Sequence, residues 1–335
     1  MAQTKLQVQF VVSKLSLLYL QLQLIIVDTD SCGRLKVFVQ GSLEQRRGKT
    51  YFITVHDMGS NHNSFVNYVN SRPMDEVRER AIFAHVCLPG QEDNAETMTA
   101  NYPLLRQIAN DLLKVLDTLN IDTCIGMGDG AGANIVCRFA IMYPERVMGI
   151  CLLHCTSTVA GPTEYIKDRT LVKGLINKGK VTSPVIEYLK THKFGESAQG
   201  STKVAKYVEQ LRARNAINLS KLLKSFLNRT DLSRTLAHDL QVDSLLVVGG
   251  RAKHLHTVYT MHRAMDRARS TLFVVSNVGD VMSEADEALT KSLILFCKGC
   301  GVLAGVNVPG MARPKNLATT TTSSSMREPD SCSQN

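Results

Sequence analysis

The residues best suited to chemistry lie on one glycine-rich turn. Residues 125–134 read Ile-Gly-Met-Gly-Asp-Gly-Ala-Gly-Ala-Asn, between an apolar run and an amphipathic segment. This pattern is typical of a strand, a tight turn and a helix. Two kinds of site use such a turn. The nucleophile elbow of hydrolases, Gly-x-Ser-x-Gly, presents a serine at the end of a strand. A dinucleotide-binding turn, Gly-x-Gly-x-x-Gly, brings backbone N–H groups to a pyrophosphate.

The order of the surrounding segments favours the elbow. A dinucleotide-binding turn follows the first strand of its unit and expects an acidic residue about 20 positions further on. Here several expected strands precede the turn, and the next strand ends in His154-Cys155-Thr156 without an acid. In the elbow frame, Gly130 takes the position of the serine. We therefore predict an elbow that has lost its nucleophile.

The other two members of a hydrolytic triad are also missing. The acid should follow the expected strand that ends at Val248, but the sequence there supplies Arg251 and Lys253. The histidine should follow the strand that ends at Ser276, where the sequence has Gly279-Asp280. A serine nucleophile needs both a base and an orienting acid. We therefore predict no catalytic residue, no cofactor and no metal ion at this site.

The remaining side chains around the elbow define a predicted vestigial pocket. Its members are Gly130, Ala131, Asp129, His56, Asp57, Met58 and Asp280. Converging carboxylates raise one another's pKa and could perform acid–base chemistry. A divergent hydrolase or lyase that uses Asp57, Asp129 and Asp280 is therefore an alternative hypothesis. The simpler interpretation makes Asp57 a turn cap and leaves Asp129 and Asp280 as solvated loop residues.

The composition is that of an ordinary globular protein. The 335 residues are 44% hydrophobic and 21% charged, and the formal net charge is +9. Lysine and arginine are scattered rather than gathered in a block, so we expect a solvated cationic surface and no nucleic-acid partner. The nine cysteines are odd in number and several lie in apolar runs, which favours a reduced, cytoplasmic protein.

Expected strands and helices alternate along most of the chain, as in βαβ units. The expected strands cover residues 22–40 (two strands and a turn), 50–55, 80–88, 123–125, 147–153, 242–248 and 271–276. Helices are expected near Phe65 and over residues 102–119, 135–143, 259–267 and 283–297. The alternation is interrupted once, by helices expected over residues 171–176, 184–189, 204–211 and 219–227.

This layout predicts an α/β-hydrolase fold, with a mostly parallel central sheet flanked by helices and an inserted helical cap. The expected boundaries are a variable apolar N-terminal extension (1–21), a first part of the core (22–156), the cap (157–240), a second part of the core (241–301) and a disordered Ser/Thr-rich tail (302–335). Polar residues interrupt the N-terminal extension, so it is a poor membrane span, and it lacks the cleavage site of a signal peptide.

Several segments together resemble the N-myc downstream-regulated (NDRG) family. They are residues 27–29, 35–41, 55–62 (Val-His-Asp-Met-Gly-Ser-Asn-His), 86–91, 126–133, 218–219 and 225–232. The His-Asp-x-Gly-x-Asn-His loop combined with a serine-free elbow is the specific feature. The chain departs from the family pattern at Asp129, where a small apolar residue is usual, at residues 156–158, which lack an Asp-Pro motif, and in its more basic cap.

The resemblance implies a non-enzymatic, cytoplasmic protein with a hydrolase-like fold, which acts through protein partners in signalling, stress response or differentiation. Family members often carry a phosphorylatable tail. The corresponding candidate phosphosites are Thr319, Thr320, Thr321, Thr322, Ser323, Ser324 and Ser325. A membrane-associated adaptor is a further alternative, because basic groups contribute about 1 kcal/mol each near an anionic lipid surface.

Overall fold

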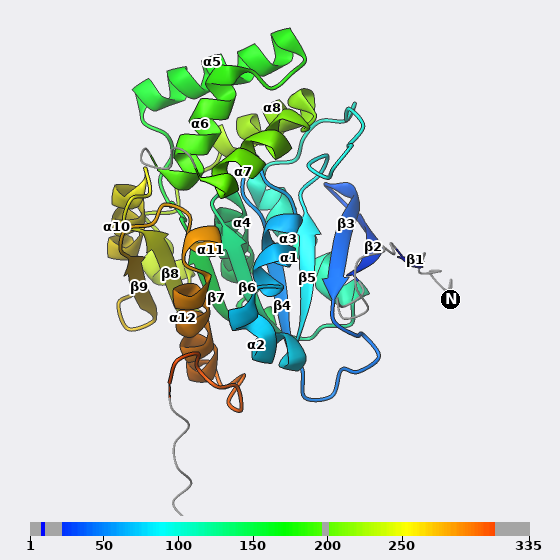
Figure 1. Cartoon of the computed structure of the whole chain (residues 1–335), viewed down its shortest axis with the longest axis vertical. Coiled ribbons are helices and arrows are strands. Elements are labelled where there is room, and N and C mark those ends of the chain that lie inside the picture. The colour runs from blue at the N-terminus through cyan, green and yellow to red at the C-terminus, as the bar shows by residue number, and fades with distance from the viewer. Residues whose placement is uncertain (1–7, 11–21, 196–200, 312–335) are drawn as a thin grey trace, which may run out of the picture.

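A nine-stranded sheet with helices on both faces forms the body of the protein (Figure 1). The computed structural model describes residues 8–10, 22–195 and 201–311. The strands are β1 (Val8–Phe10), β2 (Leu22–Thr29), β3 (Gly33–Gln40), β4 (Thr50–Val55), β5 (Ala81–Cys87), β6 (Cys124–Asp129), β7 (Val147–Leu153), β8 (Ser244–Gly249) and β9 (Ser270–Val275). Their order in the sheet is β1-β2-β3-β5-β4-β6-β7-β8-β9.

The sheet is mostly parallel, as predicted. Strands β5, β4, β6, β7, β8 and β9 pair in parallel, whereas β1, β2 and β3 form an antiparallel edge that joins β5. The α/β-hydrolase fold predicted from the sequence is confirmed by this topology. In such a sheet the carboxyl ends of the parallel strands meet at one edge, where sites are usually built.

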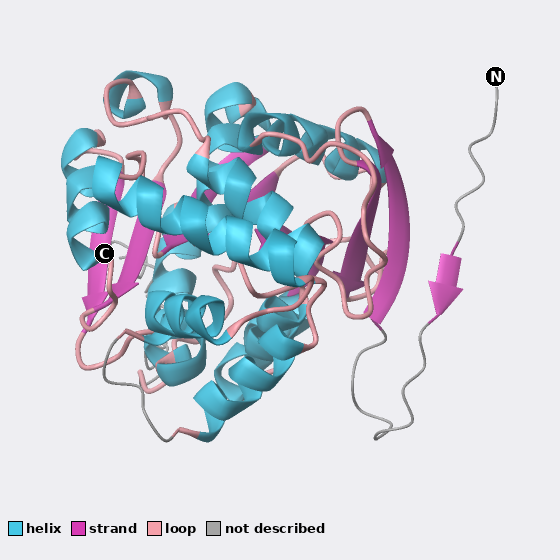
Figure 2. Cartoon of the chain, turned by 90° about the horizontal axis from the view of Figure 1, so that it is seen from above, coloured by secondary structure: helices cyan, strands magenta, loops and turns pink. Residues whose placement is uncertain are grey.

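Helices cover both faces of the sheet, which Figure 2 shows from above. One face packs against α3 (Leu105–Thr118), α4 (Ala131–Met142) and α10 (Leu255–Ala264). The other packs against α1 (Asn63–Val69), α2 (Asp75–Arg80), α11 (Val281–Glu284) and α12 (Asp286–Gly299). Both faces of the central strands are therefore buried, which explains why β4 and β7 read as continuous apolar runs rather than as alternating patterns.

Strand β6 is longer than predicted, because Gly126 and Gly128 belong to the strand and not to the turn. A Cβ atom on Gly126 would lie 2.7 Å from Val136, and one on Gly128 would lie 2.5 Å from the Cα of Ala133. Both neighbours are in α4. The glycines thus let α4 pack directly on β6, and only Gly130 forms the turn itself.

The cap lies above the carboxyl edge of the sheet (Figure 1). It consists of α5 (Pro162–Lys178), α6 (Ser183–Phe194), α7 (Thr202–Arg212), α8 (Ala216–Leu227) and α9 (Leu236–Asp239). The first four extend beyond the segments predicted for them. Helices α5 and α8 pack against each other, and α6 reaches down to the carboxyl edge of the sheet, where its C-terminal residues enter the site described below.

The segment after α12 differs from the prediction, because part of it packs on the core. Residues 302–311 were expected to begin a disordered tail, which is wrong for this segment. Leu303 and Val306 are buried against the core, and Asn307 forms hydrogen bonds to the carboxylate of Glu76. The candidate phosphosites at 319–325 lie outside the described residues. No helix among the described residues is both long and apolar enough to cross a membrane.

Candidate functional site

The backbone at Gly130 has the geometry of a nucleophile elbow. Gly130 follows β6, precedes α4 and has φ +51° and ψ −112°. A side chain at such a φ is strained, which glycine avoids. The Gly130 N–H donates to the carbonyl of Leu153 at the end of β7 (2.9 Å), which fixes the turn against the neighbouring strand. The elbow is therefore intact although the nucleophile is absent.

The carboxylate of Asp57 occupies the space of the missing nucleophile. A Cβ atom on Gly130 would lie 2.1 Å from Oδ1 of Asp57, so no side chain fits there while Asp57 keeps this position. The same oxygen accepts the backbone N–H of Ala131 at 2.8 Å. In hydrolases of this fold, the N–H after the nucleophile stabilises the oxyanion of the reaction. Asp57 thus fills both the nucleophile position and half of the oxyanion hole with a negative charge.

A neutral histidine places Asp57 there. The Nε2 atom of His56 accepts the N–H of Leu88 (3.0 Å), so its Nδ1 carries the proton and donates to the carbonyl of Asp57 (2.8 Å). Burial lowers the pKa of His56 to about 4, which agrees with a neutral ring. Both His56 and Asp57 follow β4 directly. The strand end and the histidine together determine where the carboxylate points.

The second carboxylate oxygen of Asp57 faces the cap. Nε2 of His192, on α6, lies 3.2 Å from Oδ2. Burial acts to raise the pKa of Asp57, but His192, the Ala131 N–H and the charge of Lys193 together hold it below its ordinary value. Asp57 is therefore ionised at neutral pH. It is a poor general acid, because that role needs a raised pKa.

Beside Asp57 lies a charge cluster, formed by the buried carboxylates of Asp129 and Asp280 and the partly buried side chains of His154 and Lys193. Nδ1 of His154 is 2.9 Å from Asp129, and Nε2 is 3.0 Å from the carbonyl of Gly279. Both partners are acceptors, so both ring nitrogens donate and His154 is an imidazolium. Burial acts to lower the pKa of His154, but the bond to Asp129 raises it above the ordinary value.

Lys193 of α6 completes the charge cluster. Its Nζ lies 3.3 Å from Asp129 and 3.3 Å from Asp280. Burial acts to lower the pKa of Lys193, but the two carboxylates raise it, so the amine is charged. Burial likewise acts to raise the pKa of Asp129, which Lys193 and His154 hold below its ordinary value. Two cations from different elements therefore neutralise the two carboxylates.

The charge cluster also bears on metal binding. Asp129, His154 and Asp280 offer ligand atoms within 4.8 Å of one another. A metal ligand must be deprotonated, whereas both nitrogens of His154 carry protons, and Lys193 already bridges the two carboxylates. The donor set fits an internal ammonium group better than a metal ion.

The structure brings most of the predicted pocket residues together and changes the role of some. Asp129 and Asp280 were expected to be solvated loop residues, which is wrong: they are 2% and 1% exposed. Asp129 ends β6 and Asp280 precedes α11. Met58 is buried in the apolar core on the α3–α4 face rather than lining a cavity. Gly130 and Ala131 contribute backbone only.

Sequence reasoning missed three members of the site. His192 and Lys193 come from the cap, more than 50 residues beyond the elbow and with no motif around them. His154 was recognised only as part of a strand end that lacks an acid, and no role was predicted for its side chain. The left-handed backbone of His154, with φ +49°, turns its ring toward Asp129. Only the pairing of β6 with β7 places Asp129 beside Leu153, and that pairing is a tertiary contact.

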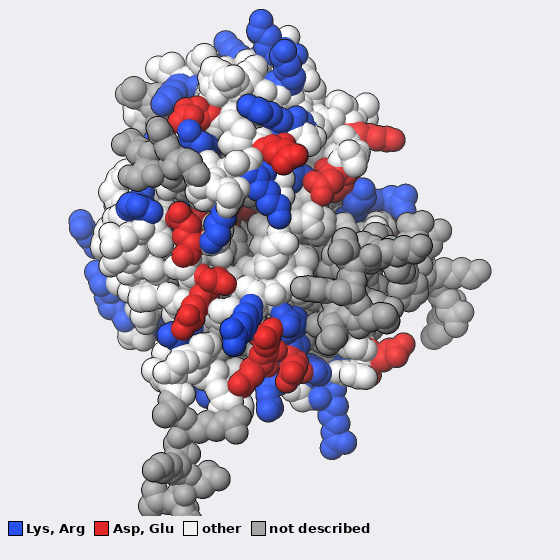
Figure 3. Space-filling view, viewed as in Figure 1, with Lys and Arg blue, Asp and Glu red and all other residues white. Residues whose placement is uncertain are grey.

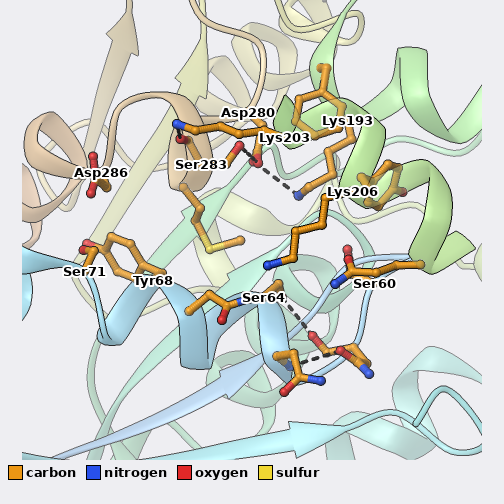
Figure 4. A pocket seen from close by; sticks show the side chains of 17 residues that line it. Ser60, Ser64, Tyr68, Ser71, Lys193, Lys203, Lys206, Asp280, Ser283 and Asp286 are labelled. Atoms are coloured by element: carbon orange, nitrogen blue, oxygen red, sulfur yellow. Dashed lines mark hydrogen bonds and ion pairs between the residues drawn. The ribbon is translucent and has the colours of Figure 1, made fainter. Parts of the chain in front are cut away.

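Two cavities border this buried region. One, of about 320 Å³, lies above Gly130 and is lined in part by His154, His192, His254 and His256. The other, of about 420 Å³, lies between α1, α7 and α11 and has Lys193 and Asp280 in its wall (Figure 4). The small space beside Asp57 and Asp129 measures only about 20 Å³. The space beside the elbow is therefore nearly filled, and the two larger cavities lie on either side of it.

One family model and several relatives match most of the chain. The model of the Ndr family matches residues 26–304. An uncharacterized protein of Caenorhabditis elegans, ZK1073.1, is 50% identical over 311 residues, which cover 92% of this chain and 93% of that protein. Protein NDRG2 of Homo sapiens is 28% identical over 281 residues, covering 81% of this chain and 74% of the relative.

Solved structures of hydrolases share the fold. A thermophilic esterase from Thermogutta terrifontis superimposes with a TM-score of 0.69 at 15% sequence identity, covering 83% of this chain and 99% of the esterase. MenH from S. aureus gives a TM-score of 0.67 at 13% identity, covering 79% of this chain and 98% of MenH. At these identities the likeness establishes the α/β-hydrolase architecture and leaves the activity open.

Proposed function

The chain belongs to the Ndr family, and from this premise we propose that it is a non-catalytic hydrolase-fold protein that serves as a binding module. Its role would be that of an adaptor in intracellular signalling, stress response or differentiation, in the cytoplasm. The Asp57 carboxylate against the Ala131 N–H is the observation that carries the non-catalytic half of this proposal.

The physical reason is electrostatic. Ester hydrolysis develops a negative charge at the oxyanion hole, and losing one donor there costs about 10²–10³ in rate. Here a carboxylate occupies the donor, so a developing oxyanion would meet a like charge instead of a hydrogen bond. The nucleophile and the base are missing as well, because Gly130 and Asp280 take their positions.

The convergence of the carboxylates favours a second candidate, a divergent hydrolase or lyase. Asp129 and Asp280 do share one cation. However, the pKa values of Asp57 and Asp129 are lowered rather than raised, which suits ion pairs and not general acids. We therefore rank this candidate second.

An ester assay separates the two candidates. Purified wild-type protein, Asp57→Asn and Asp280→Asn would be compared on p-nitrophenyl acetate and butyrate, with an active esterase of the same fold as the positive control. We expect rates equal to those of a denatured sample for all three proteins. Turnover by the wild type that is abolished by Asp57→Asn or Asp280→Asn would overturn the non-catalytic proposal.

The outer face of α5 supports the second part of the proposal, a role as a binding module. Ile166 and Ile176 are 66% and 51% exposed. Arg169 and Lys173 are exposed on the same side of the helix, and Lys180 is exposed two residues after the helix ends. Lysine and arginine side chains gather over this end of the cap in Figure 3. An apolar pair within a cationic stripe suits an acidic protein segment that carries an apolar side chain.

A binding experiment tests this face. The double variant Ile166→Asp/Ile176→Asp would be compared with the control Lys114→Asp, an exposed position on α3 outside the cap where the substitution changes the net charge by the same amount. We expect a cross-linked acidic protein partner in cells to be lost with the double variant and retained with the control. Sedimentation with vesicles of phosphatidylserine is the second arm. Vesicle binding that depends on Ile166 and Ile176, without a protein partner, would replace the protein adaptor by the membrane-associated one.

A further inference from the structure

The cavity of about 420 Å³ between α1, α7 and α11 takes no part in the proposed adaptor function. Its volume lies within the range of small-molecule sites, roughly 300–1,000 Å³. The cavity is lined by both polar and apolar surface, and Phe194 and Met282 contribute to the apolar part. A small molecule with a polar and an apolar face would fit such a space.

Two helices face each other across this cavity. Helix α1 and the residue that begins the next turn present Ser64, Asn67 and Ser71, spaced by three and four positions. Helix α7 presents Lys203, Lys206 and Gln210 at the same spacing. Residues three, four and seven positions apart share one face of a helix. Each helix therefore turns a polar stripe toward the cavity, although α1 buries Phe65 and Val69 on its opposite side.

The described lining of the cavity holds more cations than carboxylates, with Lys193, Lys203 and Lys206 against Asp280 and Asp286. At the floor, Lys193 is paired with Asp129 and Asp280. Lys203 donates to the backbone carbonyl of Ser283 and has no carboxylate partner among the described residues. Lys206 forms no hydrogen bond or ion pair within the described part of the chain, and Figure 4 shows its side chain extending across the cavity toward α1.

We propose that this cavity binds the phosphate monoester group of a small polyhydroxylated molecule. Lys203 and Lys206 contact the phosphate, and Asn67, Gln210 and Asp286 bind hydroxyl groups of the rest of the ligand. Lysine binds phosphate as a point charge, whereas planar carboxylates are preferentially bound by the two-pronged guanidinium of arginine. The described lining of the cavity contains lysines and no arginine, which favours phosphate. This assignment does not depend on the adaptor role.

One phosphate monoester could come from two sources, a soluble sugar or polyol phosphate, or the headgroup of a lipid. The experiment therefore has two arms, both with the purified full chain. In the first arm, glucose 6-phosphate, glucose and inorganic sulfate are titrated by calorimetry. In the second, vesicles of phosphatidylcholine with and without phosphatidic acid are sedimented with the protein.

Three variants make the test specific. Lys206→Met removes the free cation, and Asn67→Asp adds a negative charge on the opposite wall; both residues are exposed, so both proteins should fold. The matched control is Lys173→Met, an exposed lysine on α5 outside the cavity. Thermal unfolding checks that all three variants are as stable as the wild type.

We expect the wild type to bind glucose 6-phosphate and not glucose or sulfate. Lys206→Met and Asn67→Asp should each weaken binding about tenfold, and Lys173→Met should leave it unchanged. Binding to phosphatidic acid vesicles with the same dependence on Lys206 and Asn67 would support the site and assign the phosphate to a lipid. Absence of phosphate binding in both arms, or an equal loss with Lys173→Met, would overturn the proposal.

Discussion

At the scale of single residues, buried hydrogen bonds and ion pairs hold the site together. The Asp57 carboxylate accepts the Ala131 N–H, the group that faces the oxyanion in active hydrolases of this fold. Lys193 bridges Asp129 and Asp280, and it belongs to the cap while they belong to the core. These contacts therefore hold two parts of the chain together.

Replacing Lys193 by methionine tests this interpretation. The change would leave two buried carboxylates without their ammonium partner, and breaking a buried ion pair from one side costs about 3–5 kcal/mol. Urea unfolding of the purified variant measures the loss. The variant Lys193→Met/Asp280→Asn should recover part of the lost stability, because it removes one of the unpaired charges.

The matched control is Lys190→Met on the same helix. Lys190 pairs with Glu187, which is 64% exposed, and such a surface pair contributes about 1 kcal/mol or less. If Lys193→Met destabilised the protein no more than Lys190→Met, the buried charge cluster would have no role in holding the cap.

At the scale of elements, the packing of β6 against α4 and β4 depends on glycine. A Cβ atom on Gly132 would lie 2.0 Å from the carbonyl oxygen of Val55, at the end of β4. That oxygen belongs to the backbone and cannot rotate away. The glycines of the elbow sequence are thus required for packing, whatever the chemistry of the site.

Gly132→Ala should therefore be strongly destabilising. Forcing a methyl group into a filled space costs about 1–3 kcal/mol, and here the methyl group would push α4 away from the end of β4. Gly174→Ala on α5 is the control, because a Cβ atom there meets nothing within 4 Å and alanine favours a helix by up to about 1 kcal/mol. Relative to the wild type, we expect the denaturation midpoint to fall in Gly132→Ala and to rise in Gly174→Ala. Equal effects would contradict the packing role of Gly132.

The sequence predicted the elements better than the contacts between them. Strands over residues 50–55 and 147–153 were predicted to the residue, because both are continuous apolar runs. The end of β6 was missed, since glycine usually marks a turn and here marks close packing. The elbow could be found from local spacing. His192 and Lys193 could not, because only the folding of the cap onto the core brings α6 to the elbow.

At the scale of the whole molecule, buried neutral histidines make stability depend on pH. Burial lowers the pKa of His56 to about 4 and those of His62 and His85 to about 3. The unfolded chain binds protons on the same rings below about pH 6.5. It therefore takes up more protons than the folded protein as the pH falls below that value, and stability is lost on the acid side.

We expect the free energy of unfolding to fall between pH 6.5 and 4, by up to about 1.4 kcal/mol per pH unit for each histidine. His85→Gln should reduce this slope by one such increment, since glutamine is neutral and can replace the bonds to Thr54 and Gln40. Urea titrations at pH 7.5, 6.0 and 5.0 measure the slope. An unchanged slope in His85→Gln would contradict the assignment.

Two aspartates and His154 also make the free energy of unfolding depend on pH, on the acid and the basic side respectively. Asp57 and Asp129 have lowered pKa values, so their contribution is present above the ordinary aspartate pKa and is lost as the pH falls through the folded values. His154 has a raised pKa. Its contribution is complete below the ordinary histidine pKa and disappears as the pH rises through the folded value.

The docking of Asn307 on Glu76 has a consequence for how the molecule could be arranged between partners. This contact holds the last described residues at the end of the sheet opposite the cap (Figure 1). Residue 311, the last one that the structure describes, therefore lies at one pole of the protein, while the outer face of α5 forms the other pole. A partner bound to the outer face of α5 would leave the surface around Asn307 and Glu76 accessible to a second partner, and the folded domain would set the distance between the two.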